Sequence, residues 1–120
     1  LFTVHATVMI FLWIVPATTG GFGNFLVPLM IGARDMAFPR LNAIAFWLIP
    51  PAGILLLSSF LVGAPASGWT SYPPLSLVSG KAGEFIWILS VLLLGTSSIL
   101  AAVNFLVTIL KMRVSGMGFN

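Results

Sequence analysis

Three long apolar runs dominate the sequence and leave little of it for anything else. They cover about residues 1–31, 40–62 and 84–110, and two connecting segments separate them. A helix that crosses a bilayer needs about 20 mostly apolar residues, and each run reaches that length. Because a backbone in lipid must satisfy its own hydrogen bonds, each run is expected to be helical. The predicted fold is an all-α membrane protein, with three transmembrane helices that belong to a larger helical bundle.

The composition excludes the main soluble classes. Hydrophobic residues make up 59% of the chain and charged residues 6%, whereas a soluble domain is about one quarter charged. The net charge of +3 comes from five scattered basic residues, which are too few for a nucleic-acid-binding surface. With no cysteine, the chain has no disulfide and no thiolate metal ligand. Its partner is therefore the lipid bilayer, and we expect it to be a piece of a larger membrane protein.

Prolines and glycines interrupt the first two runs and fill the second connecting segment. Pro16 is expected to kink the first helix because it lacks a backbone N–H, and the glycines after it would let a helix or a flat cofactor approach closely. Pro50 and Pro51 are expected to bend the second helix in its middle. Segment 63–83 is rich in Gly, Pro and Ser and is expected to be irregular.

The basic residues predict an orientation. With three helices, one side of the membrane receives four of them, Arg34, Arg40, Lys111 and Arg113. The other side receives Lys81 alone. The positive-inside rule therefore places loop 32–39 and the C-terminus in the cytoplasm. The start of the chain then lies near the outer face.

His5 is the only ionisable side chain of the first run. Neutral imidazole is a good ligand for haem iron, and Met9 and Trp13 follow at helical spacing on the same face. Such an apolar face with one imidazole can hold a porphyrin edge-on against the helix. The alternatives are a proton relay, or a histidine that hydrogen-bonds to another helix or reaches the membrane interface.

Three amides lie at similar depth toward the predicted cytoplasmic side, Asn24, Asn42 and Asn104, one in each run. The third run adds uncharged hydroxyls along its length, to give the set Asn24, Asn42, Ser90, Ser97, Ser98, Asn104 and Thr108. In the third run, three of them recur every seventh residue from Ser90 and so share one helix face. Asp35 is the only carboxylate on that side, and a surface acid followed by groups that order water is the layout of a proton-entry path. The alternative is that amides and hydroxyls join the helices, with Asp35 paired to Arg34 or Arg40.

Trp69 lies in the second connecting segment, on the predicted outer side. Its indole N–H can donate a hydrogen bond to an anionic group such as a carboxylate. The alternative is an aromatic anchor at the membrane interface.

Four stretches resemble subunit I of the haem-copper oxidases, of the cytochrome c oxidase branch. They are VHATVMIFLWIVP, GGFGNFLVPLMIGARDMAFPRLNAIAFWLIPP, GWTSYPPL and SSILAAVNF. They follow the family's order over nearly the whole chain, which would correspond to the second, third and fourth membrane spans of that subunit. MAFPRLN favours a cytochrome c oxidase over a quinol oxidase. GARDMAFP, with Arg before Asp, is similar to bacterial members.

The resemblance implies roles for individual residues. His5 corresponds to an axial ligand of the low-spin haem, which Met9 would also face, and Trp69 to a tryptophan that bonds a propionate of the oxygen-reducing haem. Asp35 corresponds to the acid that opens a proton channel. The channel itself would be lined by Asn24, Asn42 and Asn104 at its entrance and by Ser97 and Ser98 further along.

The resemblance also implies the activity of the parent protein. Electrons would pass from cytochrome c, through a copper centre on subunit II, to the low-spin haem and then to a second haem and copper, where oxygen becomes water and protons are pumped. The second haem and the copper would be bound mostly outside this chain, so the chain alone is expected to be inactive. The implied partners are the remaining spans of subunit I, subunits II and III, cytochrome c and oxygen, in a bacterial plasma membrane. A quinol oxidase, a proton-conducting transporter fragment and a scaffold subunit without a site are the alternatives.

Overall fold

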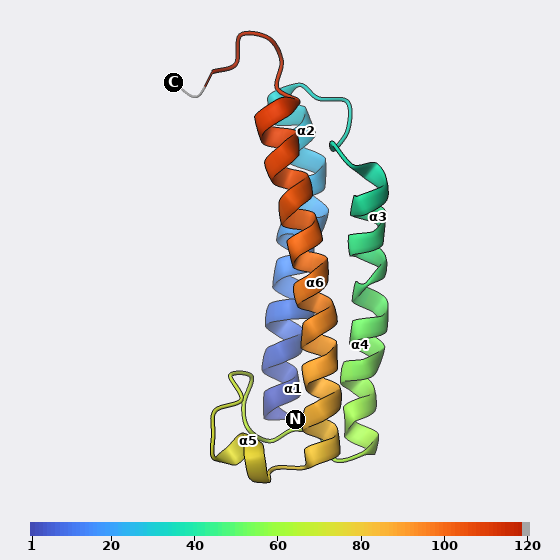
Figure 1. Cartoon of the computed structure of the whole chain (residues 1–120), viewed down its shortest axis with the longest axis vertical. Coiled ribbons are helices and arrows are strands. Elements are labelled where there is room, and N and C mark those ends of the chain that lie inside the picture. The colour runs from blue at the N-terminus through green and yellow to red at the C-terminus, as the bar shows by residue number, and fades with distance from the viewer. Residues whose placement is uncertain (119–120) are drawn as a thin grey trace.

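Three long helices run side by side in the computed structural model, which describes residues 1–118 (Figure 1). They cover Phe2–Ile31, Pro39–Leu61 and Lys81–Lys111, and each is long and apolar enough to cross a membrane. Residues 1–118 contain no strand. The prediction of an all-α membrane protein with three spanning helices is therefore confirmed.

The first helix widens around its proline. It consists of α1 (Phe2–Thr7), the π-helical segments η1 (Val8–Ile14) and η2 (Pro16–Gly23), and α2 (Asn24–Ile31). The ring of Pro16 crowds the carbonyl four residues earlier, and wider turns relieve that contact. The hydroxyls of Thr18 and Thr19 donate to the carbonyls of Ile14 and Val15, each at 2.7 Å. The disturbance expected at Pro16 thus appears as wide turns within a continuous helix.

The second helix is interrupted next to its proline pair. It consists of α3 (Pro39–Trp47), α4 (Ile49–Ser58) and a 3₁₀ turn, η3 (Ser59–Leu61). Pro50 and Pro51 lie in the first turn of α4. There a backbone N–H has no partner within the helix, so a proline is tolerated. The discontinuity expected in mid-helix consequently lies just before the prolines, at Leu48.

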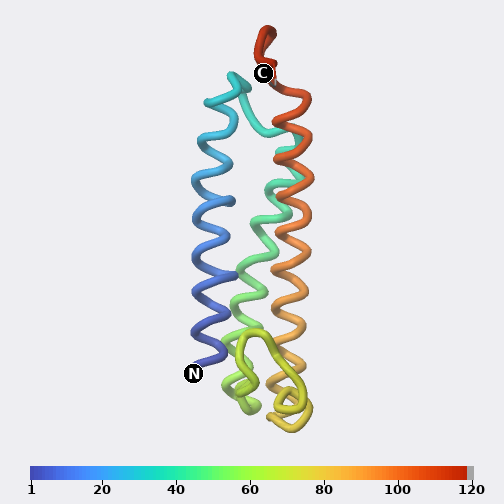
Figure 2. The backbone as a smooth tube through the Cα atoms, turned by 90° about the vertical axis from the view of Figure 1, so that its left-hand side faces the viewer, coloured from blue at the N-terminus to red at the C-terminus, as the bar shows by residue number. Residues whose placement is uncertain are grey.

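The third helix, α6 (Lys81–Lys111), packs along α3 and α4 and also contacts the first helix (Figures 1 and 2). It begins three residues before the expected position, which places Glu84 in its first turn. The loop before it contains one short helix, α5 (Leu75–Val78). This loop lies at the same end of the molecule as the N-terminus (Figure 1).

The opposite end of the molecule is closed by the loop between the first two helices. Gly32, at φ +73°, ends α2, and the N–H of Ala33 donates to the carbonyl of Pro28 at 2.8 Å. Such a left-handed glycine cap satisfies carbonyls that the helix end leaves free. The N–H of Val114 donates to the carbonyl of Ile31 at 3.1 Å, which brings the segment after α6 to this end.

The basic residues are divided between the two ends as the three-helix topology requires. Arg34 and Arg40 lie with the end of α6 at Lys111, whereas Lys81 begins α6 at the opposite end. The predicted position of the C-terminus itself falls on residues 119–120, which lie outside the described residues.

Buried hydroxyls of α6 bond directly to the backbone of the second helix. Ser90 Oγ donates to the carbonyl of Ala52 at 2.7 Å, and Ser97 Oγ donates to the carbonyl of Ala45 at 2.5 Å. A step of seven residues along α6 is matched by seven residues in the opposite direction along its antiparallel neighbour. These bonds therefore define the register of the two helices.

The same pattern continues into the loop before α3. Asn104 Oδ1 accepts a hydrogen bond from the N–H of Phe38 at 2.9 Å, again seven residues further along both partners. Thr108 Oγ1 accepts from the N–H of Ala37 at 2.9 Å and donates to the carbonyl of Asn104 at 2.6 Å. We call this row the seam, formed by Ser90, Ser97, Asn104 and Thr108 with their backbone partners. All four side chains are buried.

Gly83→Ala is expected to destabilise the fold, because a Cβ at Gly83 would lie 1.6 Å from the carbonyl oxygen of Gly63. The two backbones would have to separate, at a cost on the order of 1–3 kcal/mol. Gly95→Ala is the matched control in the same helix, since nothing lies within 4 Å of its added Cβ. Thermal unfolding in mild detergent of the membrane protein that carries this chain measures both. Equal melting temperatures for the two variants would contradict the close approach.

Asn104→Ala is expected to loosen the loop before α3, because it leaves the N–H of Phe38 without its acceptor in the fully buried Asn104 side chain. The expected loss of stability is about 1–3 kcal/mol. Thr96→Ala serves as the control, since the Thr96 hydroxyl is exposed and bonds only to Leu92 of its own helix. Unfolding titrations with a denaturing detergent compare the two variants. The seam would be unimportant if both variants unfolded at the wild-type concentration.

Candidate functional site

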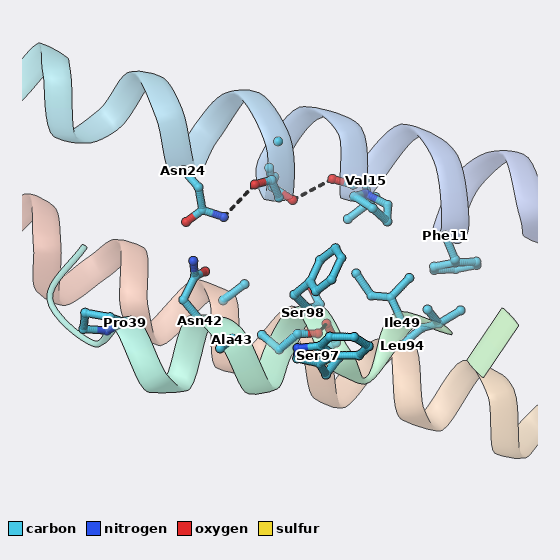
Figure 3. Close-up of a pocket in the computed structure, with 18 of the residues that line it drawn as sticks. Phe11, Val15, Asn24, Pro39, Asn42, Ala43, Ile49, Leu94, Ser97 and Ser98 are labelled. Carbon is cyan, nitrogen blue, oxygen red and sulfur yellow. Dashed lines mark hydrogen bonds between the residues drawn. The ribbon is translucent and has the colours of Figure 1, made fainter. Parts of the chain in front are cut away.

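A cavity of about 600 Å³ separates the first helix from the other two (Figure 3). Five of the six residues predicted for a proton path line it, namely Asn24, Asp35, Asn42, Ser97 and Ser98. The side chains of Asn24 and Asn42 point toward one another across the cavity (Figure 3). At the other end its walls are apolar, with Phe11, Ile49 and Leu94. The cavity therefore joins a polar mouth to an apolar inner end.

Small residues of the wide-turned segment η2 make room for this cavity. Thr19, Gly20 and Gly21 line it, and nothing described lies within 4 Å of a Cβ added at Gly20. Gly23 behaves differently, because its added Cβ would lie 2.8 Å from the ring of Phe105. Of the glycines after Pro16, Gly23 thus permits close helix packing, and Gly20 leaves open space.

Two buried side-chain amide atoms, one in Asn24 and one in Asn104, have no hydrogen-bond partner among the described residues. Asn24 Nδ2 donates to the carbonyl of Gly20 at 2.7 Å, but its Oδ1 is buried and unpaired. Asn104 Nδ2 is likewise buried and unpaired. Buried polar atoms are normally satisfied by protein or by ordered water, and a cavity of about 600 Å³ with a polar mouth has room for water. The wall at Asn24 therefore suits a chain of waters.

Asp35 lies exposed at the polar mouth. Its Oδ1 accepts a hydrogen bond from the N–H of Met36 at 2.7 Å. Within residues 1–118 no ion pair joins it to Arg34 or Arg40, so the pairing considered as an alternative is not formed there. The carboxylate is open to water.

The polar stripe of the third run serves mainly to join helices, which was the alternative reading of its pattern. Ser97 belongs to the seam and also lines the cavity, and the exposed Ser98 lines it without a seam bond. Asn104 does not line the cavity, because its Oδ1 is bonded to the N–H of Phe38. The six predicted residues therefore do not form one continuous wall.

His5 lies at the opposite end, on an exposed face of α1. Thr3 and Thr7, two residues before and after it, are buried. Residues two apart on a helix differ by about 200° in direction, so burying both threonines turns His5 outward. Met9 and Trp13 share this outward face, being 41% and 65% exposed.

Hydrogen bonds hold the two threonines in place. Thr7 Oγ1 accepts from the indole N–H of Trp87 at 2.9 Å and donates to the carbonyl of Thr3 at 2.8 Å. Thr3 Oγ1 accepts from the N–H of Gly68 at 2.9 Å. These contacts connect α1 to both α6 and the loop that carries Trp69, so they fix the rotation of α1 about its axis. The imidazole of His5 has no hydrogen-bond partner within residues 1–118.

Trp69 is 44% exposed and lies at the same end as His5. Its ring contacts Phe11 at a centroid separation of 6.3 Å and an interplanar angle of 60°. Phe11 also lines the apolar end of the cavity. The indole N–H has no partner within residues 1–118 and is free to bond to a group supplied from outside this part of the chain.

Glu84 is a buried acid that the sequence marks only as the start of the third run. It is 6% exposed, and hydroxyls of Ser67, Ser71 and Ser79 donate to its carboxylate. The sequence pattern that could have indicated a bonded carboxylate is an acid at the edge of an apolar run, preceded by a serine-rich loop. The bonding partners of Thr3 and Thr7 carried no such signal, because their bonds depend on which helices become neighbours.

Residues 1–120 match the family model described as "Cytochrome C and Quinol oxidase polypeptide I". The chain is 71% identical over 117 residues to a cytochrome c oxidase subunit 1 of Synechocystis sp. and 67% identical over 118 residues to one of Thermostichus vulcanus. It is also 51% identical over 120 residues to a cytochrome c oxidase subunit 1 of Yarrowia lipolytica.

These alignments cover 98% of this chain in each case, and 21%, 21% and 22% of the respective relatives. The chain thus spans about a fifth of the length of the curated relatives it matches. Because the family match extends over the whole chain, the chain belongs to the family of cytochrome c and quinol oxidase polypeptide I.

Proposed function

We propose that this chain is the part of a proton-pumping cytochrome c oxidase subunit I that ligates the low-spin haem and admits protons. The observation that carries the proposal is the cavity, which assembles Asp35 with four of the predicted channel residues from three different helices. The three relatives compared are named cytochrome c oxidase, which favours cytochrome c over quinol as the electron donor. The parent enzyme would use the electrons to reduce oxygen to water.

In this proposal Asp35 receives protons from water at the cytoplasmic mouth. Its carboxylate is exposed and free of the neighbouring arginines, so it can exchange protons with bulk water. Beyond it, Asn24 and Asn42 offer amide groups from opposite walls to order a chain of waters, and Ser97 and Ser98 follow. An uncharged lining suits proton transfer, because a fixed charge in this low-dielectric interior would hold the proton or repel it.

His5 is proposed to ligate the low-spin haem through its outward-facing imidazole. The face fits a haem, since it presents one unpaired imidazole with apolar Met9 and Trp13 exposed beside it. When bound, the haem supplies one-electron transfer. The bonds of Thr3 and Thr7 would keep the imidazole aimed at the iron, so that little freedom is lost on ligation.

Trp69 is proposed to donate its indole N–H to a propionate of the oxygen-reducing haem. That haem and the copper would be ligated by parts of subunit I beyond this chain, because the single histidine, His5, is assigned to the low-spin haem and the chain has no cysteine. The chain alone is therefore expected to be inactive. The remaining spans would cover its exposed apolar faces.

We propose a multi-pass position in a bacterial plasma membrane, with loop 32–39 and the C-terminus in the cytoplasm. Support comes from the basic residues at that end and from the three membrane-length helices. The enzyme would work with subunits II and III and accept electrons from cytochrome c through subunit II. A proton-conducting transporter would use the same cavity but would need no haem ligand at His5.

His5→Ala is expected to abolish the low-spin haem signal of the assembled oxidase, because alanine offers no ligand to the iron. Visible spectra of the purified complex measure it. Met9→Leu is the control, since leucine keeps an apolar side chain on the same face and should retain the signal. A low-spin spectrum unchanged in His5→Ala would refute the ligand assignment.

Asp35→Asn is expected to slow turnover by at least about tenfold, because the amide cannot take up and release a proton at the mouth. Oxygen consumption and proton release by the oxidase in sealed vesicles measure the effect. Asp35→Glu keeps a carboxylate and should retain most of the rate. Wild-type turnover and pumping in Asp35→Asn would rule out this residue as the entry point.

A further inference from the structure

One carboxylate ties the loop that carries Trp69 to the start of α6. Glu84 is buried in the first turn of α6, where a negative charge is favourable at a helix N-terminus. Its Oε1 accepts hydrogen bonds from Ser67 Oγ at 2.8 Å and from Ser71 Oγ, and its Oε2 accepts from Ser79 Oγ at 3.3 Å. A buried carboxylate is costly unless it is hydrogen-bonded, so the three hydroxyls and the loop hold each other in place.

The two serines that share Oε1 flank Trp69, two residues before it and two residues after it. Both ends of the short segment that presents the indole therefore converge on one oxygen atom. Within the segment, the N–H of Ser71 donates to the carbonyl of Gly68 at 3.1 Å, which closes a turn. We call residues 67–71 the Trp69 turn.

The backbone of this turn needs external support. Ser71 has φ +52°, a left-handed conformation that costs free energy for a residue with a side chain, and Gly68 has φ +82°. The hydroxyl of Ser71 is bonded to Glu84, and the N–H of Gly68 is bonded to Thr3. The unfavourable conformation is thus stabilised from α6 on one side and from α1 on the other.

The indole itself has little packing to orient it. Trp69 is 44% exposed, and its one aromatic partner within residues 1–118 is Phe11. The direction of its N–H consequently depends on the backbone of the Trp69 turn more than on the core.

We infer that Glu84 is a positioning residue for Trp69. By accepting hydrogen bonds from Ser67 and Ser71, at the two ends of the Trp69 turn, Glu84 sets the direction of the indole N–H. The inference deepens the proposed function and rests on it for the group that the indole bonds, a haem propionate. Glu84 touches no cofactor in this scheme, and its effect reaches the haem through Ser67, Ser71 and the indole.

The stabilisation of the Trp69 turn by Glu84 is tested first without reference to haem. Hydrogen–deuterium exchange of the turn's backbone amides is measured in the assembled oxidase. In Glu84→Ala the turn loses two bonds to a charged acceptor, so its amides should exchange about tenfold faster or more. Glu84→Gln keeps one carbonyl oxygen that both serines can reach and should restore slow exchange. Ser79→Ala is the matched control, because it removes a bond to Oε2 outside the turn. If Glu84→Ala does not assemble, Ser67→Ala combined with Ser71→Ala removes the same two bonds.

Exchange as slow as in the wild type, in Glu84→Ala or in the double serine variant, would overturn the inference. Fast exchange in Ser79→Ala as well would also overturn it, since the effect would then belong to the whole loop.

The link to the indole is tested by the midpoint potential of the oxygen-reducing haem. Trp69→Phe and Glu84→Ala should shift this potential in the same direction, and the double variant should shift it no further than Trp69→Phe alone. Additive shifts would mean that the charge of Glu84 acts on the haem directly, which would overturn the positioning role. No shift in Trp69→Phe would refute the proposed propionate contact, while the exchange experiment would still decide whether Glu84 grips the turn.

Discussion

The seam between α6 and the second helix is the interaction on which the rest of the structure depends. In lipid, apolar contacts between helices gain little over contacts with acyl chains, so hydrogen bonds and close packing decide which helices meet and in what register. Ser90 and Ser97 bond to backbone carbonyls of the second helix, and Asn104 and Thr108 bond to backbone N–H groups just before it. Because the four side chains of the seam are buried, a slip of one residue would leave several of them without partners.

The cavity exists because the first helix is fastened mainly at its two ends. At one end Thr3 and Thr7 bond to the Trp69 turn and to Trp87. At the other end the carbonyl of Ile31 accepts from Val114. Between them, wide turns and glycines leave a gap that the side chains of the other helices do not fill. Close packing of the first helix against the other two along its whole length would have left no cavity.

The two ends of the molecule carry different chemistry for a physical reason. At the cavity mouth, an exposed acid and uncharged amides suit the passage of protons, which needs water. At the other end, hydrogen bonds of the buried Glu84, Thr3 and Thr7 hold the loop that carries Trp69 and leave His5 on the exposed face of α1. The length of the helices separates the water-exposed Asp35 at the cavity mouth from the hydrogen bonds of Glu84, Thr3 and Thr7. Each end can therefore differ in polarity and packing without affecting the other.

The sequence by itself determined the class of protein, because three runs of this length and apolarity can only be stable as helices in lipid. It also singled out two candidates for chemistry, since His5 is the only ionisable side chain of the first run and Asp35 is the only carboxylate at its end of the molecule. The tertiary structure decided which polar residues meet. Asn104 and Ser97 share one face of the third helix, yet only Ser97 lines the cavity. The side chain of Asn104 instead accepts a hydrogen bond from the N–H of Phe38 through its Oδ1. The partners of Glu84 were decided in the same way, since Ser67 and Ser71, 17 and 13 residues before it, reach its carboxylate only after the loop folds back over α6. Periodicity specifies a face of one helix, whereas the partner of a polar atom depends on the register between helices, and that register exists only in the folded protein.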